Sequence, residues 1–193
     1  HRFDDTVALE ETVNALDQTV RDGKALYIGI SNYDTKQTKE AIAMFKDLHT
    51  PFVLNQYSYN MFNRTAETSG LIDALKADGA GLIAYGPLSE GLLSDRYLKG
   101  IPDTFKIHPT NKATFAKGKE AVVKQLNALN EIAHDRDQTL SQMALAWLLR
   151  DPVVTSVIIG TTSVEHLQDN LKATEHLTFT AEEIQQIDDI LNA

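Results

Sequence analysis

The stretch Ser156-Val-Ile-Ile-Gly-Thr-Thr-Ser-Val-Glu-His-Leu-Gln-Asp-Asn170 predicts a short strand, a glycine turn and a helix in succession. Val157, Ile158 and Ile159 are apolar and β-branched, as is typical of a strand buried on both faces of a parallel sheet. Gly160 and three hydroxyl residues then lead into a helical pattern. Such a turn directs backbone N–H groups and the positive end of a helix dipole at an anion. The stretch fits a phosphate-binding turn, and it also fits an ordinary strand-to-helix turn with a capped helix.

Strand and helix patterns alternate along the rest of the chain. Apolar runs predict earlier strands at residues 25–30, 52–57 and 81–85. Amphipathic or capped patterns predict helices at residues 7–22, 35–48, 69–78, 117–135 and 140–150, with another at the C-terminus. Possible capping boxes occur at Asp34/Gln37, Thr139/Gln142 and Thr180/Glu183. Short connections predict a parallel α/β sheet with right-handed crossovers.

Residues 88–113 interrupt this alternation with glycines, prolines and scattered charges, and predict a long functional or mobile loop. The four predicted strand–helix units amount to an open sheet or to about half of a (β/α)8 barrel, which needs about 250 residues in full.

Composition narrows the class of protein. The chain has 193 residues, 42% of them hydrophobic and 23% charged, which predicts a single globular domain over residues 1–193. Its net charge of −9 argues against nucleic acid or an anionic membrane as the main partner. There are no cysteines and the histidines show no metal-ligand spacing, so no disulfide framework and no metal site are expected. The lack of cysteines fits a cytoplasmic protein, and neither a transmembrane helix nor a signal peptide is expected.

The predicted strand ends carry the candidate site. Ligands of parallel α/β folds meet the C-terminal ends of the strands. Three of these ends offer amide or hydroxyl groups, which suit a carboxamide or hydroxyl ligand, and the end at Tyr85 offers an aromatic ring. The last strand and the loop containing Gly91 and Arg96 suit a phosphate. The joint pattern predicts a nucleotide cofactor across the strand ends, although any one of these amides also fits a loop-stabilising role. No G-x-G-x-x-G follows a strand, which argues against a Rossmann site.

Four motifs in order resemble the aldo-keto reductases, in the branch of bacterial methylglyoxal and glyceraldehyde-phosphate reductases and potassium-channel β-subunits. They are Gly29-Ile-Ser-Asn-Tyr33, Asn55-Gln-Tyr-Ser-Tyr-Asn60, Ala84-Tyr-Gly-Pro-Leu88 with Gly91-Leu-Leu93, and the stretch 156–170. The family fold is a (β/α)8 barrel that binds NADPH without a Rossmann domain. The resemblance therefore implies that residues 1–193 are the C-terminal half of such a barrel, with the N-terminal half absent.

The resemblance also implies roles for individual residues. Ser31, Asn32 and Gln56 would hold the nicotinamide carboxamide, and Tyr85 would stack on the nicotinamide ring. The pyrophosphate would follow Gly86, Pro87, Leu88, Glu90, Gly91 and Arg96. The adenosine end would meet Gly160, Thr162, His166, Asp169 and Asn170. NADPH is the expected cofactor, and NADH stays open because Thr161-Thr-Ser163 stands where many relatives carry Lys or Arg; Lys106, Lys112 or Lys117 could supply that cation instead.

His1-Arg-Phe-Asp4 resembles the segment that carries the family's catalytic histidine, so His1 would orient the substrate and polarise its oxygen. The family's catalytic Tyr, Lys and Asp belong to the first half of the barrel, and no segment here matches them. The expected reaction is NADP(H)-dependent reduction of an aldehyde or ketone such as methylglyoxal, with a small carbonyl substrate as the partner. Two alternatives remain: a non-catalytic, nucleotide-sensing subunit similar to channel β-subunits, and an unrelated α/β protein with a phosphate site. Open sheet edges also suggest a homo-oligomer.

Overall fold

The computed structural model describes residues 1–192, which form two compact units. Unit 1 comprises residues 1–58, 65–85 and 153–156, and unit 2 comprises residues 59–64, 86–152 and the chain from residue 157 onward. The elements are, in order, α1 (Leu9–Arg21), β1 (Ile28–Ser31), α2 (Thr35–Asp47), β2 (Phe52–Ser58), α3 (Thr65–Thr68), α4 (Leu71–Asp78), β3 (Gly81–Tyr85), η1 (Asp95–Tyr97), η2 (Pro109–Asn111), α5 (Lys119–Asp135), α6 (Leu140–Leu149), β4 (Val154–Ile158), α7 (Val164–Leu171), η3 (Lys172–Glu175) and α8 (Ala181–Asn192). None of the described helices is long and apolar enough to cross a membrane.

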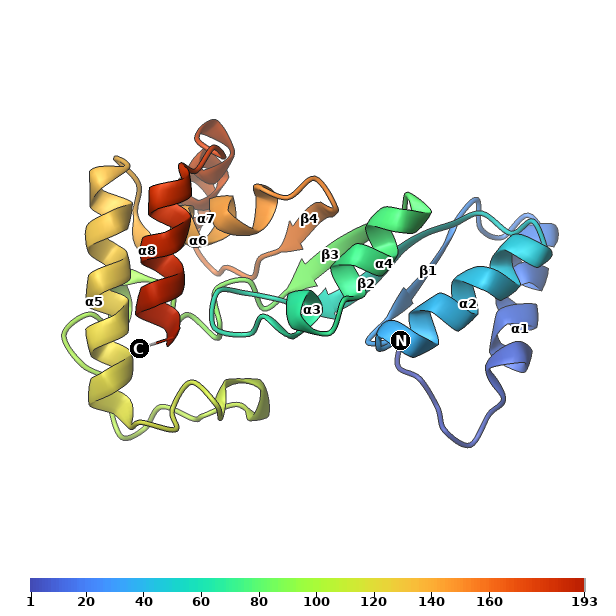
Figure 1. The fold of residues 1–193 in the computed structure, drawn as a ribbon, viewed down its shortest axis with the longest axis horizontal. Helices are drawn as coiled ribbons and strands as arrows, with labels where there is room; N and C mark the ends of the chain where they lie inside the picture. Colours follow the sequence, from blue (N-terminus) through green and yellow to red (C-terminus); the bar gives the residue numbers. More distant parts are fainter. Residues whose placement is uncertain (193) are drawn as a thin grey trace. The chain divides into compact units, whose positions relative to one another are not determined.

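Unit 1 is built on parallel strands joined by helices, which confirms the predicted α/β class. The sheet order is β1-β2-β3-β4, with Ser31 of β1 opposite Gln56 of β2. Figure 1 shows α1, α2 and α4 alongside these strands. The hydrophobic core of unit 1 includes Val13, Ile30 and Phe45. Because all strands run the same way, their carboxyl ends lie at one edge of the sheet.

Local sequence accounts for the start of α2 and for its attachment to the sheet. Asp34 accepts the Gln37 N–H at 2.8 Å, and the Gln37 side chain accepts the Asp34 N–H, so the predicted capping box is present. The buried Asn55 side chain donates to the Tyr33 carbonyl and to Thr38 Oγ1, both at 3.0 Å. Asn55 therefore ties β2 to the start of α2, which is the structural role left open for it.

Two strand predictions need correction. The strand predicted at residues 25–30 begins only at Ile28. Leu26 and Tyr27, which precede it, are 80% and 64% exposed and so gain little from packing against the sheet. The strand predicted to be buried on both faces is β4, which starts earlier and leaves Ile158 45% exposed. β4 is an edge strand in the sheet order, so it is paired on one side only. A β-branched run thus predicted strand conformation correctly and burial wrongly.

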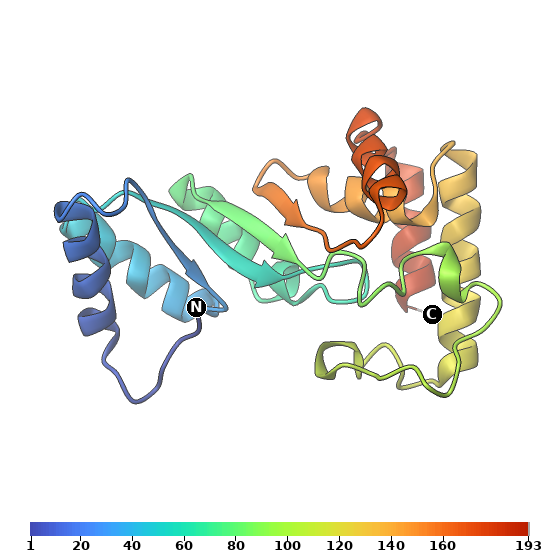
Figure 2. The same cartoon turned by 180° about the vertical axis from the view of Figure 1, so that it is seen from behind.

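Unit 2 is mainly helical, and Figure 2 shows α5 and α8 side by side. The predicted apolar stripe of α5 is buried, and α6 is buried along almost its whole length, with Trp147 fully enclosed. The predicted capping boxes at Thr139/Gln142 and Thr180/Glu183 are both present. α7 forms where the 3.6-residue period predicts it, but its apolar residues Val164 and Leu171 are 67% and 57% exposed.

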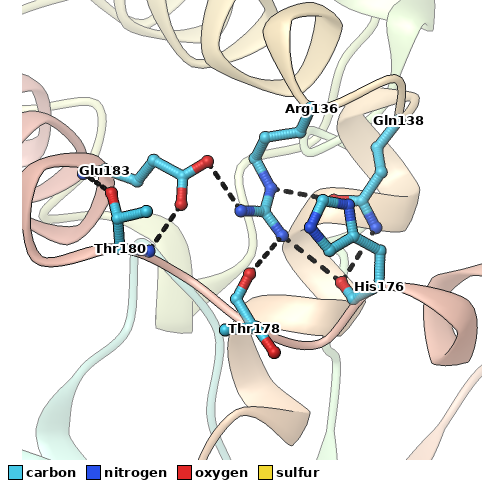
Figure 3. Close-up of polar contacts among 6 residues, drawn as sticks. All are labelled: Arg136, Gln138, His176, Thr178, Thr180 and Glu183. Carbon is cyan, nitrogen blue, oxygen red and sulfur yellow. Dashed lines mark hydrogen bonds and ion pairs between the residues drawn. The ribbon is translucent and has the colours of Figure 1, made fainter.

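A buried arginine fastens the turn after α5 to the segment before α8 (Figure 3). Arg136 donates to Gln138 Oε1 at 3.0 Å, to Glu183 Oε1 at 2.7 Å, and to the carbonyls of His176 and Thr178 at 3.3 and 3.0 Å. Its guanidinium also lies 3.7 Å from the centroid of the Phe179 ring. The planar, five-donor fork of arginine suits this set of acceptors, which a lysine would not satisfy.

Candidate functional site

A chain of side-chain hydrogen bonds joins the four residues predicted to hold a nicotinamide. Tyr85 Oη donates to Asn32 Oδ1 at 2.7 Å, and Asn32 Nδ2 donates to Ser31 Oγ at 2.9 Å. Ser31 Oγ in turn lies 3.4 Å from Gln56 Oε1. All four residues belong to unit 1, and we call them the amide cluster. Residues from β1, β2 and β3 thus meet at the carboxyl edge of the sheet, as the strand-end argument predicted.

The backbone places the amide cluster. Ser31 and Gln56 are register partners, and the Asn32 N–H donates to the Gln56 carbonyl at 2.9 Å. Asn32 has φ +59°, a left-handed conformation that asparagine tolerates better than most residues. This conformation ends β1 and leaves the Asn32 amide in reach of Tyr85.

The donors of the amide cluster fit a carboxamide ligand. Within the described residues, Gln56 Nε2 makes no hydrogen bond, and it supplies two N–H donors. A primary carboxamide offers one acceptor and two donors, so it complements side-chain amides of this kind. The Tyr85 ring is partly exposed and is held by its hydroxyl, which leaves a planar surface for a planar ligand.

His1 is exposed and precedes α1. Phe3 packs edge-to-face on Tyr33 with ring centroids 5.3 Å apart. Figures 1 and 2 both draw the start of the chain beside the tip of β1. Within the described residues no hydrogen bond or ion pair joins His1 to the amide cluster, so its predicted role stays a prediction.

Two tyrosines near the amide cluster have pKa values unsuited to a proton donor. Burial raises the pKa of Tyr33. Burial, followed by electrostatic interactions with Asp34 and Tyr85, raises the pKa of Tyr57. A general acid working near neutral pH needs a lowered tyrosine pKa. These raised pKa values agree with the expectation that no segment of this chain supplies the family's catalytic tyrosine.

Unit 2 contains a cavity of about 860 Å³, which lies within the size range of ligand pockets. Eleven predicted site residues line it: Gly86, Pro87, Leu88, Glu90, Gly91, Arg96, Gly160, Thr162, His166, Asp169 and Asn170. They come from the turn after β3, from η1, and from the turn and helix after β4. Residues 70 or more positions apart in sequence therefore share one cavity, as predicted.

The turn after β3 has an unusual backbone. Gly86 and Gly91 have φ +64° and +82°, and the non-glycine residues Ser89 and Glu90 have φ +51° and +58°. The N–H groups of Ser89 and Gly91 donate to the carbonyls of Gly86 and Leu88, each at 3.0 Å. Turns with left-handed residues form concave surfaces that attract anions. This turn is the predicted pyrophosphate segment.

Charge in the cavity is mixed. Among the described residues that line the cavity, Arg96 is the only Lys or Arg, while Glu90, Asp95 and Asp169 are acidic. The α7 helix begins beside the cavity, where Ser163 Oγ accepts the His166 N–H at 3.3 Å. An anion here would rely on Arg96, backbone N–H groups and the helix terminus, because no cluster of cations surrounds it.

The sequence argument missed several cavity residues: Ser94, Asp95, Thr139, Ser141, Ile158, Ile159 and Thr161. Thr139 was identified only as a helix cap. The buried Gln142 accepts the Thr139 N–H and donates to Asp169 O and Oδ1 at 3.0 and 2.9 Å, which links the start of α6 to the end of α7. No local pattern signals that contact, since it depends on how the helices pack. The only sequence signal for Thr139 and Ser141 was their position as hydroxyl residues at the N-terminus of a predicted helix.

Comparison with known protein sequences identifies one family. The sequence model of the Aldo/keto reductase family matches residues 1–192. L-glyceraldehyde 3-phosphate reductase of Escherichia coli (strain K12) is 43% identical over 192 residues, which cover 97% of this chain and 56% of that protein. The putative voltage-gated potassium channel subunit beta of Schizosaccharomyces pombe is 34% identical over 200 residues, covering 100% of this chain and 58% of that protein. The chain thus spans little more than half the length of these curated relatives.

Solved structures agree on the fold. The thermostable aldo-keto reductase Tm1743, crystallised with the inhibitor epalrestat, superposes with a TM-score of 0.75 at 33% identity, covering 98% of this chain and 57% of that one. Glycerol dehydrogenase AKR11B4 from Gluconobacter oxydans gives a TM-score of 0.80 at 24% identity, covering 99% and 56%. The predicted partial (β/α) barrel is thereby confirmed. By sequence over its whole described length and by fold, this chain belongs to the aldo/keto reductase family.

Proposed function

We propose that this chain is the C-terminal portion of an NADP(H)-dependent oxidoreductase that reduces aldehydes or ketones to alcohols. The observation that carries the proposal is the unit 2 cavity of about 860 Å³, which gathers eleven residues that the sequence predicts to bind a dinucleotide. The amide cluster of unit 1 adds donors and acceptors suited to a nicotinamide carboxamide. Family membership supports an oxidoreductase in general.

Each group of residues has a task in this proposal. The amide cluster binds the carboxamide and fixes the ring orientation, with Tyr85 as the stacking surface. The turn at residues 86–91 and Arg96 bind the pyrophosphate, and residues of α7 bind the adenosine end. When bound, the cofactor supplies a hydride for carbonyl reduction. His1, which Phe3 holds near the loop after β1, hydrogen-bonds the carbonyl oxygen and orients the substrate.

The matched relatives are longer than this chain, so we place the proton-donating tyrosine in a segment outside residues 1–193. We further propose a cytoplasmic location and a small carbonyl substrate such as methylglyoxal. Arg96 binds the pyrophosphate, which NADPH and NADH share, so Arg96 does not discriminate between the two. The preference for NADPH needs a cation at the 2′-phosphate, for which the exposed Lys106 or Lys112 is the candidate.

Calorimetric titration of the intact protein with NADPH and with NADH tests the proposal. We expect saturable 1:1 binding of NADPH, weakened by Arg96→Ala and, for NADPH more than NADH, by Lys106→Ala. Lys36→Ala on α2, an exposed lysine of unit 1, is the matched control. Absence of binding to either nucleotide would refute the proposal.

A second function is favoured by one specific observation, the 34% identity to a putative potassium channel subunit beta. In that case the protein binds the dinucleotide as a regulatory subunit and turns carbonyl substrate over slowly or not at all. Steady-state oxidation of NADPH by the intact protein with a panel of aldehydes separates the two functions. Turnover typical of enzymes, about 1 s⁻¹ or more, supports the reductase.

A further inference from the structure

The long loop between β3 and α5 is fastened back onto its own beginning by two buried side chains. Ser89 Oγ donates to Asn111 Oδ1 at 2.9 Å. Ser89 is 2% exposed and Asn111, at the end of η2, is 1% exposed. Twenty-two positions separate them, so the bond closes a large loop. Both residues belong to unit 2.

This contact differs from the other ties of the loop. Asn127 Nδ2 donates to the Leu98 carbonyl and Lys119 Nζ to the Pro102 carbonyl in exposed surroundings, and Ser141 Oγ donates to the Leu93 carbonyl in partly buried surroundings. A hydrogen bond away from water keeps more of its strength than an exposed one. The Ser89–Asn111 bond is therefore the tie best able to define the loop's geometry.

The turn that Ser89 belongs to needs such a constraint. Ser89 and Glu90 occupy the left-handed region in succession, with φ +51° and +58°, although neither is glycine. That conformation is costly for residues with a Cβ, and surrounding contacts must hold it in place. Leu88 and Glu90, the neighbours of Ser89, line the cavity. Holding Ser89 thus fixes the backbone on both sides of it where the cavity wall lies.

Asn111 carries a further mark of a positioning role. Its Nδ2 atom is buried without a hydrogen-bond partner among the described residues. Reversing the amide would leave the oxygen unpaired instead, so either orientation carries the cost of one unmade bond.

We propose that Asn111 is a positioning residue for dinucleotide binding: through Ser89 it holds the left-handed Ser89–Glu90 pair and so fixes the cavity wall at Leu88 and Glu90. The proposal rests on the proposed function, because it takes residues 86–91 to be the pyrophosphate turn. It assigns a role in binding to η2, a segment that does not itself line the cavity.

The test is a double-variant cycle in the intact protein with Ser89→Ala, Asn111→Leu and the two combined. Each single variant should weaken NADPH binding about tenfold, the effect expected for losing one buried hydrogen bond. The combined variant should lose no more than either single one, since both break the same contact. The Michaelis constant for NADPH should rise while kcat changes less than twofold.

Asn127→Ala is the matched control, because it removes an exposed asparagine tie of the same loop. It should leave NADPH affinity within twofold. Thermal unfolding of each variant without nucleotide separates affinity from stability: a merely structural role lowers the midpoint and leaves the dissociation constant unchanged.

The outcomes are distinguishable. If the native protein binds neither NADPH nor NADH, the proposed function fails and this inference falls with it. If the native protein binds and both single variants bind equally well, or if their effects add, only the inference is overturned. Should Asn111→Leu fail to fold, Ser89→Ala alone decides, because it removes one hydroxyl and no packing volume of note.

Discussion

Replacing Arg136 with alanine is predicted to destabilise the helical unit severely. The Arg136 side chain is 2% exposed and joins residues 136–138 to residues 176–183 through three hydrogen-bonded partners (Figure 3) and the ring of Phe179. The substitution removes the cation and leaves the Glu183 carboxylate and the carbonyls of His176 and Thr178 without that donor. His176 and Thr178 lie on the exposed connection before α8, and the Glu183 side chain is 23% exposed, so water can replace part of the lost donor.

The expected loss follows from the geometry. Breaking a buried ion pair by removing one partner costs about 3–5 kcal/mol, mainly because the other partner is left uncompensated. The contact of the guanidinium with Phe179 adds about 0.5–2 kcal/mol. Because the Glu183 side chain is 23% exposed, the lower end of the ion-pair range applies, and we expect Arg136→Ala to lower the free energy of unfolding by about 3–5 kcal/mol in total, a large share of the about 5–15 kcal/mol of an ordinary domain. Urea unfolding followed by circular dichroism and by Trp147 fluorescence measures it.

Two further variants sharpen this experiment. Arg136→Lys keeps the charge but loses the planar fork, and it should recover less than half of the loss. Arg96→Ala, measured without nucleotide, is the matched control, because Arg96 is exposed and should change stability by about 0.5 kcal/mol or less. A loss below about 1 kcal/mol for Arg136→Ala would refute the view that this cluster fastens α8 to the rest of its unit.

Three other predictions concern pH, the nicotinamide end and catalysis. Burial pushes the pKa of Glu183 up, but the Thr180 N–H and the Arg136 guanidinium outweigh it and hold that pKa below its ordinary value. The resulting stabilisation is present above the unfolded pKa of about 4.3 and is lost as the pH falls through the folded pKa. Thermal midpoints of the native protein should therefore drop more steeply below about pH 4 than those of Glu183→Gln, and parallel curves would contradict this. Tyr85→Ala should weaken NADPH binding about tenfold by removing the stacking surface. Tyr85→Phe loses only the hydrogen bond to Asn32 and should weaken binding about threefold or less; equal losses for the two variants would place the effect in the hydroxyl. Residues 1–193 by themselves should not oxidise NADPH with methylglyoxal, because the proposal places the proton-donating tyrosine elsewhere; turnover near that of an intact reductase would overturn that assignment.

Much of the fold follows from local rules. Capping boxes at Asp34, Thr139 and Thr180 mark helix starts that the structure reproduces, because a cap needs only residues three positions apart. Strand β3 appears with its predicted bounds, since Gly79 and Gly86 frame an apolar run. The predicted burial of residues 157–159 was wrong, because burial depends on which elements cover a strand and local pattern does not contain that information.

The site shows the same division. Strand-end position and family resemblance predict eleven of the residues that line the cavity and the four members of the amide cluster. They did not identify Thr139 or Ser141, which reach the cavity because α6 packs beside the chain after β4. Nor did they identify Asn111, whose partner lies 22 positions away in an irregular loop with no periodicity to follow.

The sequence by itself determined the order of the main strands and helices and the start of each capped helix, because hydrophobic period, caps and glycines act over a few residues. It also determined that the strands run parallel, since short crossovers leave few other topologies. Only the tertiary structure decided which side chains are buried and which distant residues touch: the Arg136 cluster, the hydrogen-bonded chain from Tyr85 to Gln56, and the bond between Ser89 and Asn111. Those contacts depend on packing between segments far apart in the chain, a property that no short stretch of sequence encodes.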